Sequence, residues 1–166
     1  MKKIVVALIL LISFQHVHAQ QAEEDTIPPY VHFPTVPAFN VMIAPDSTSF
    51  SNADLKRKQP VIFIVFSPDC GHCKNFTKEL LAKYDMVKKA RIIMASSLDY
   101  DLIKKFYEDD KIADYPGISM GRDGNYSLGT FFKVRSFPTV VVYDKKGNFV
   151  KRFDGGAAIE KIAEVL

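Results

Sequence analysis

The chain has 166 residues, of which 48% are hydrophobic and 12% aromatic, so it is long and apolar enough for one domain with a buried core. Its formal net charge is +3, and its basic residues come in scattered pairs and triplets rather than in a stripe. This distribution argues against a nucleic-acid partner.

Residues 1–19 have the three parts of a secretory signal peptide. Lys2 and Lys3 form a basic start, residues 4–14 are an apolar run, and residues 17–19 suit a signal peptidase that cuts after Ala19. The apolar run covers only about half of the ~30 Å hydrocarbon core at about 1.5 Å per residue, so we disfavour a retained membrane tether. Cleavage lowers the 22 basic residues to 20, against 19 acidic ones. We therefore expect a periplasmic protein with a nearly neutral mature chain.

Residues 20–37 contain four prolines and have no hydrophobic period, which predicts an extended, flexible lead-in. One domain is expected over residues 38–166. Its first short strands are predicted at residues 39–43 and around Phe50.

A continuous β-branched and aromatic run at residues 61–66 predicts a strand that is buried on both faces. Residues 67–69 end this strand, and Asp69 is a candidate helix cap. In the helix expected next, an apolar face at helical spacing is formed by Cys73, Phe76, Leu80, Leu81 and Tyr84.

Strands and helices alternate through the rest of the chain. Residues 91–97 and 139–143 predict buried strands, residues 149–153 a strand paired with the latter by a hairpin, and residues 109–127 a loop with room for a short strand. Helices are expected at residues 100–107, 128–134 and 157–165. The pattern is that of an α/β domain with three layers and a central mixed sheet.

The sequence Cys70-Gly71-His72-Cys73 at the start of a predicted helix is the candidate redox site. These are the two cysteines of the chain, and a bridge that closes so small a loop adds little stability, which favours a chemical role. Residues three apart on a helix have Cβ atoms about 5–6 Å apart, near the ~3.5–4.5 Å of a disulfide, and Gly71 eases the difference. The positive helix end lowers the pKa of Cys70, so Cys70 is the expected attacking thiol. Cys73, one turn further on the apolar face, is the expected resolving thiol.

His72 has two interpretations. As an imidazolium it would favour the thiolate and make the disulfide a stronger oxidant, which we prefer to a plain surface role. Asp69 would act in the opposite direction. Zinc is disfavoured because His32 is the only other histidine after residue 19, and neither a metal nor a cofactor is expected.

Two stretches, VIFIVFSPDCGHCKNF at 61–76 and SFPTVVVYDKKGNFVKRFDGG at 136–156, resemble the thioredoxin superfamily, and in particular its exported TlpA-like branch. The resemblance covers roughly residues 38–166. The separation of 68 positions between Cys70 and Pro138 fits this branch, which inserts an extra strand–helix segment. The resemblance implies that Pro138 is cis and faces the dithiol. It also implies that Phe137 contacts the substrate through its backbone.

Three positions depart from the family pattern. Asp69 stands where many members have tryptophan, which this chain lacks altogether. A buried acid that helps the second cysteine of thioredoxin to lose its proton would fall at Ile64, and a glutamate of some TlpA-like members would fall at Phe76. No proton acceptor for Cys73 is therefore predicted. The CGHC sequence resembles that of protein disulfide isomerase, with a potential of about −180 mV against about −270 mV for thioredoxin.

The sequence thus predicts an exported thiol–disulfide oxidoreductase that acts on exported protein thiols or disulfides through a mixed disulfide. A membrane electron-transfer partner would reset it. The alternative is a copper-handling or thiol-binding module with Cys70, Cys73 and His72 as ligands. A peroxiredoxin-like peroxidase is disfavoured, because residues 67–70 lack the threonine that such a site needs.

Overall fold

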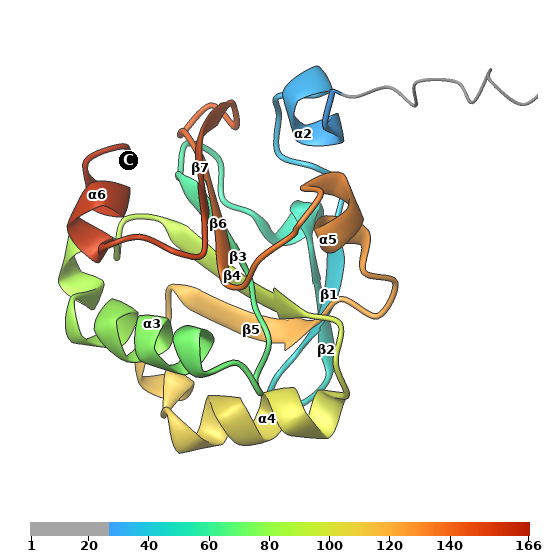
Figure 1. Cartoon of the computed structure of the whole chain (residues 1–166), viewed down its shortest axis with the longest axis vertical. Coiled ribbons are helices and arrows are strands. Elements are labelled where there is room, and N and C mark those ends of the chain that lie inside the picture. The colour runs from blue at the N-terminus through green and yellow to red at the C-terminus, as the bar shows by residue number, and fades with distance from the viewer. Residues whose placement is uncertain (1–26) are drawn as a thin grey trace, which may run out of the picture.

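A seven-stranded mixed sheet forms the middle layer of the molecule, in the order β2-β1-β5-β4-β3-β6-β7 (Figure 1). The computed structural model describes residues 27–166, so the predicted signal peptide lies outside the described residues. The strands are β1 (Asn40–Ile43), β2 (Thr48–Ser51), β3 (Val61–Val65), β4 (Arg91–Ser96), β5 (Ile118–Arg122), β6 (Thr139–Tyr143) and β7 (Phe149–Asp154). The helices are α2 (Pro29–His32), α3 (Gly71–Ala82), α4 (Tyr100–Asp109), α5 (Ser127–Phe131) and α6 (Ile159–Ala163).

The central strand β3 pairs in parallel with β4 and antiparallel with β6. All five of its residues are buried, as the uninterrupted apolar run predicts for a strand covered on both faces. Because successive side chains point to opposite faces, Ile62 and Ile64 enter one hydrophobic core while Val61, Phe63 and Val65 enter the other.

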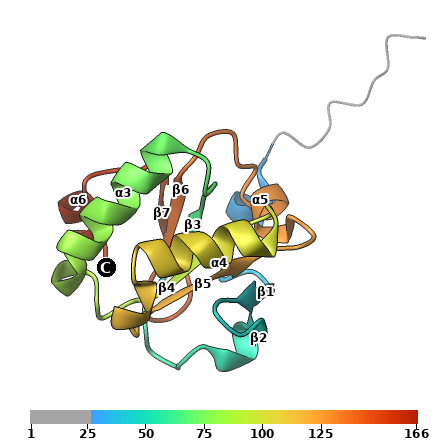
Figure 2. The same ribbon diagram turned by 90° about the horizontal axis from the view of Figure 1, so that it is seen from below.

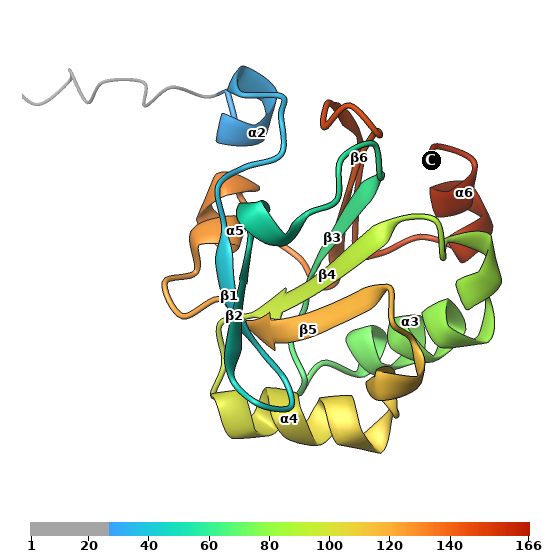
Figure 3. The ribbon, with the colours of Figure 1, turned by 180° about the vertical axis from the view of Figure 1, so that it is seen from behind.

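The two hydrophobic cores lie between the three layers, one on each face of the sheet. One core lies under α3, α4 and α6, and Figure 2 shows α3 and α4 crossing this face of the sheet. The other contains Phe63, Phe132 and Tyr143 and is covered by α5 and α2, which lie on the far side of the sheet from α3 in Figure 3. The predicted three-layer α/β architecture is confirmed.

The extra strand–helix segment is also present, since β4, α4, β5 and α5 all lie between α3 and β6. Residues 109–127, expected to be mostly loop, contain β5, which pairs in parallel with β4 and antiparallel with β1. Gly121 allows the close pairing with β1, because a Cβ there would lie 2.4 Å from the carbonyl oxygen of Met42. The glycine that weakens the strand pattern in the sequence is therefore needed for the pairing.

The lead-in differs from the expected flexible segment within residues 28–36. One helical turn, α2, begins after Pro28, and the ring of Tyr30 lies 5.3 Å from that of Phe149. Backbone bonds then fix the chain, from Phe149 N to the oxygen of Pro34 at 2.8 Å and from Val36 N to the oxygen of Gly147 at 2.9 Å. This part of the lead-in is docked on the β6–β7 hairpin by contacts between distant residues.

Candidate active site

The candidate dithiol lies at the start of α3, after the short connection from β3. The chain turns over residues 67–69, with Cys70 N donating to the oxygen of Ser67 at 3.1 Å, and Cys70 takes the N-cap position of α3. Asp69, the candidate cap, is exposed and does not cap the helix; within the described residues no side chain does so. The first N–H groups of α3 are therefore available to the Cys70 sulfur.

The two thiols are free and have opposite surroundings. Cys70 is half-buried, and hydrogen bonds from the N–H and then the thiol of Cys73, and last from the N–H of His72, favour its thiolate and lower the pKa of Cys70. Cys73 is 0% exposed, and this burial raises the pKa of Cys73 to about 12. One sulfur is reachable and easily ionised, and the other is shielded and protonated.

Gly71 and His72 lie on the outer surface of the first turn of α3. A Cβ at Gly71 would have open space around it, so this glycine is not required by packing. The backbone N–H of His72 acts on Cys70, while its imidazole is exposed to solvent.

The peptide bond between Phe137 and Pro138 is cis, as the resemblance implies. Pro138 is buried just before β6, and Phe137 is 36% exposed. Gly156 brings this turn close to the dithiol helix, because a Cβ there would lie 3.2 Å from Pro138 Cγ and 3.1 Å from Phe76 Cδ2. Gly156 thus lies next to both Pro138 and the helix that begins at the dithiol.

Gly156 was not among the predicted site residues. The sequence signal was the Gly155-Gly156 pair, which indicates only a break after β7. Its backbone adopts a φ of +84°, and the absence of a side chain allows Phe76 and Pro138 to approach. Phe76 and Gly156 are 80 positions apart in sequence, so no local sequence pattern could predict their contact.

The positions where relatives carry an acid are apolar and buried, with Ile64 1% and Phe76 7% exposed. Over residues 27–166, no group of three or more His, Cys, Asp or Glu side chains is placed to hold a metal ion. In the same range, no helix is long and apolar enough to cross a membrane.

A mixed sheet with a dithiol at the start of a covering helix, and a cis proline near that helix, defines the thioredoxin-like class of proteins. The chain belongs to the thioredoxin-like domain family, which residues 47–166 match. The predicted superfamily is confirmed.

Curated relatives include protein disulfide-isomerases. The erp38 isomerase of Neurospora crassa is 26% identical over 119 residues, or 72% of this chain, and the isomerase of Ricinus communis is 24% identical over 121 residues, or 73%. The chain spans 27% and 20% of the length of these two relatives. The predicted enzyme class, a thioredoxin-like oxidoreductase, agrees with these matches.

Solved structures share the fold. StoA from Bacillus subtilis has a TM-score of 0.61 at 18% identity, covering 79% of this chain and 98% of that chain. A secreted Mycobacterium tuberculosis disulfide oxidoreductase homologous to E. coli DsbE has a TM-score of 0.62 at 13% identity, covering 76% and 92%. These neighbours support the predicted fold.

Proposed function

We propose that the protein is an exported thiol–disulfide oxidoreductase that exchanges its Cys70–Cys73 pair with the thiols or disulfides of exported proteins. The observation that supports this proposal is the asymmetry of the two sulfurs. Cys70 is half-buried with a lowered pKa, whereas Cys73 is fully buried with a pKa raised to about 12. An attacking thiol must be reachable and ionised, and a resolving thiol must wait until the first step has occurred.

In the reducing direction, the Cys70 thiolate attacks one sulfur of a substrate disulfide. The substrate S–S bond breaks, its other sulfur leaves as a thiolate and takes a proton, and a mixed disulfide joins Cys70 to the substrate. Cys73 then loses its proton and attacks the Cys70 sulfur, which releases the second substrate thiol. The substrate gains two electrons and two protons, and the Cys70–Cys73 disulfide forms. The reverse sequence oxidises a dithiol substrate.

The substrate would lie along the turn that contains Phe137 and Pro138. Phe137 is 36% exposed and precedes Pro138, which lies close to Gly156 beside Phe76 of the dithiol helix, so a polypeptide substrate can reach this turn. The names of the two relatives, both protein disulfide-isomerases, favour polypeptide substrates. The secreted Mycobacterium tuberculosis neighbour favours export. The protein would act in the periplasm, where a membrane electron-transfer partner would reset the pair.

The test is a trapping experiment on exported proteins. Cys73→Ser should accumulate stable mixed disulfides on Cys70, because the shielded sulfur that releases the substrate is gone. Cys70→Ser, the matched control, leaves only the buried thiol and should trap far less. Equal trapping by the two variants would show that the assigned roles of Cys70 as attacking thiol and Cys73 as resolving thiol are wrong.

A Cu(I) titration of the wild type tests the copper-handling alternative. That alternative predicts tight binding of Cu(I), which His72→Ala should weaken.

A further inference from the structure

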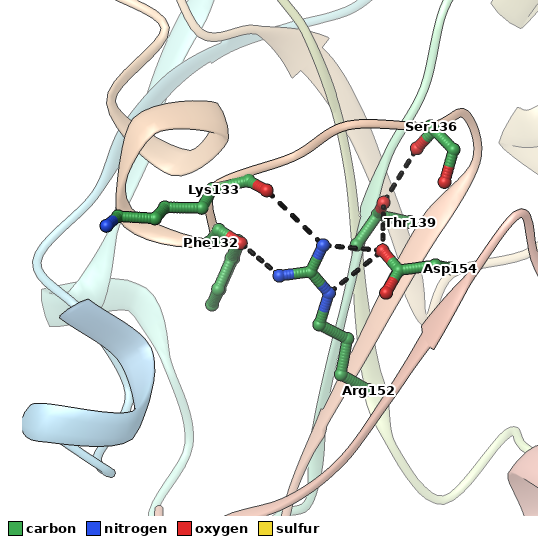
Figure 4. A network of polar contacts seen from close by, with 6 residues as sticks. All are labelled: Phe132, Lys133, Ser136, Thr139, Arg152 and Asp154. Atoms are coloured by element: carbon green, nitrogen blue, oxygen red, sulfur yellow. Dashed lines mark hydrogen bonds and ion pairs between the residues drawn. The ribbon is translucent and has the colours of Figure 1, made fainter. Parts of the chain in front are cut away.

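Arg152 and Asp154 form an ion pair on the edge strand β7 (Figure 4). This ion pair contacts the turn that contains Phe137 and Pro138. Arg152 and Asp154 lie two residues apart and therefore on the same face of this strand. The Arg152 side chain is only 11% exposed, and its Nε lies 2.9 Å from Asp154 Oδ1. In the β6–β7 register, Asp154 stands opposite Thr139, the residue after Pro138.

Arg152 holds the start of the turn. Its Nη1 donates to the carbonyl oxygen of Phe132, and its Nη2 donates to that of Lys133 at 3.4 Å. The chain leaves α5 here, with Lys133 in the left-handed conformation at a φ of 46°. Because carbonyls at a helix end lack intrahelical partners, the guanidinium supplies donors that fix the direction of the chain.

The partner carboxylate reaches the end of the turn. The Thr139 hydroxyl donates to the carbonyl oxygen of Ser136 at 2.7 Å, and Asp154 Oδ1 lies 3.3 Å from the same hydroxyl. Thr139 is fully buried, which shields its hydroxyl from water, whereas the side chain of Asp154 is 53% exposed. One ion pair thus contacts the chain on both sides of Phe137 and Pro138.

The N-terminal segment covers the guanidinium of Arg152. The ring centroid of Tyr30 lies 5.1 Å from the guanidinium carbon of Arg152 and 6.4 Å from the ring of Phe132. A cation over an aromatic face is held more strongly when water is excluded, so α2 adds a third support to Arg152.

We propose that Arg152 is a positioning residue of the redox site, which holds the backbone of Phe137 and Pro138 in the geometry that a polypeptide substrate needs. This inference rests on the proposed function of the dithiol. Arg152 touches neither sulfur, so it acts through the turn alone. A polypeptide that pairs with the turn depends on Arg152, whereas a small disulfide that meets only Cys70 does not.

The experiment compares two substrates, insulin and hydroxyethyl disulfide, with dithiothreitol as the reductant. Arg152→Met keeps the side-chain length but removes all donors, and it should raise the KM for insulin about tenfold while the rate with hydroxyethyl disulfide changes less than about twofold. Arg152→Lys should recover part of the loss, since an ammonium can pair with Asp154 but cannot contact both carbonyls. The control is Lys151→Met, an adjacent exposed residue whose Nζ lies over the ring of Phe153, and both rates should stay unchanged.

A merely structural Arg152 would slow both substrates alike, and an irrelevant one would slow neither; either result overturns the positioning role. Should Arg152→Met fail to fold, Asp154→Asn and Tyr30→Leu weaken the same contacts from either side and must show the same selectivity for insulin. A wild type inactive on both disulfides would instead refute the proposed function. Wild-type activity with an unchanged substrate ratio in the variants would defeat the positioning role alone.

Discussion

At the scale of single residues, the site consists of two identical side chains in opposite environments. Three positions on a helix separate a sulfur at the N-cap, beside unpaired N–H groups, from a sulfur on the buried face. The amphipathic pattern around Cys73 and the turn residues before Cys70 predict this difference from the sequence. The position of the N-cap was not predictable. The sequence favours Asp69, a common capping residue, but Cys70 takes this position.

The lowered pKa of Cys70 and the raised pKa of Cys73 predict how the reduced protein reacts with iodoacetamide. Only the thiolate reacts, so a lowered pKa raises the reactive fraction at neutral pH, and a raised pKa removes it. One thiol, Cys70, should be alkylated with a midpoint below the ordinary value of about 8.5. Cys73, with a pKa of about 12, should stay unmodified. Mass spectrometry of the alkylated protein checks this, with the unfolded protein as control. Two thiols reacting at one midpoint in the folded protein would contradict it.

His72 offers a separate test, because its imidazole and its backbone N–H can be removed independently. His72→Ala removes the imidazole, and His72→Pro removes in addition the N–H that favours the Cys70 thiolate. Weaker stabilisation of the thiolate destabilises the reduced form, so His72→Pro should lower the reduction potential by tens of millivolts, where about 30 mV corresponds to ~1.4 kcal/mol. His72→Ala should change the reduction potential only by the contribution of the imidazole. Equilibration with glutathione measures both, and unchanged potentials would make His72 a bystander.

At the scale of elements, the buried strands were predictable and their partners were not. The runs at β3 and β6 are β-branched or aromatic throughout, and β4 has four apolar residues in succession, which indicates burial on both faces whatever the neighbours are. The strand β5 contains Ser119 and Gly121, so its position inside the sheet depends on contacts with β1 and β4 that no local pattern carries. The same is true of Tyr30, whose aromatic partners lie about a hundred positions away.

The connection from β7 to α6 contains two adjacent glycines, of which one can be tested and the other serves as a matched control. Gly155 and Gly156 both have positive φ, 77° and 84°, but only Gly156 faces Phe76 and Pro138. Gly155→Ala should lower the free energy of unfolding by about 1–2 kcal/mol through backbone strain alone. Gly156→Ala should lower it by a further ~1–3 kcal/mol through overpacking, and should also slow insulin reduction by displacing Pro138. Urea unfolding and the insulin assay measure the two effects. Equal losses for both variants would show that the approach at Gly156 is not tight.

At the scale of the whole molecule, the proposed redox site is built from three parts of the chain that are remote in sequence. The helix α3 contains the dithiol, the turn before β6 contains Phe137 and Pro138, and β7 with the residues after it contains Arg152, Asp154 and Gly156. The segment before β1 reaches the same region through Tyr30. The chemistry could be predicted from one motif, whereas the supports of the site arise from the sheet topology that brings β6 and β7 together.

The proposed export of the whole chain depends on residues 1–19. Residues 4–14 are too short an apolar run to span the hydrocarbon core, and residues 17–19 fit the small-residue positions of a cleavage site. We therefore expect the mature protein to begin at Gln20 and to be released from the periplasm without detergent. Fractionation and mass spectrometry of the N-terminus decide this, with a variant that replaces Ala19 by a bulky residue as the control that blocks cleavage. Recovery of the intact chain from the membrane fraction would favour a tether. In that case the chemistry of Cys70 and Cys73 would stand, but the reachable substrates would be those close to the membrane.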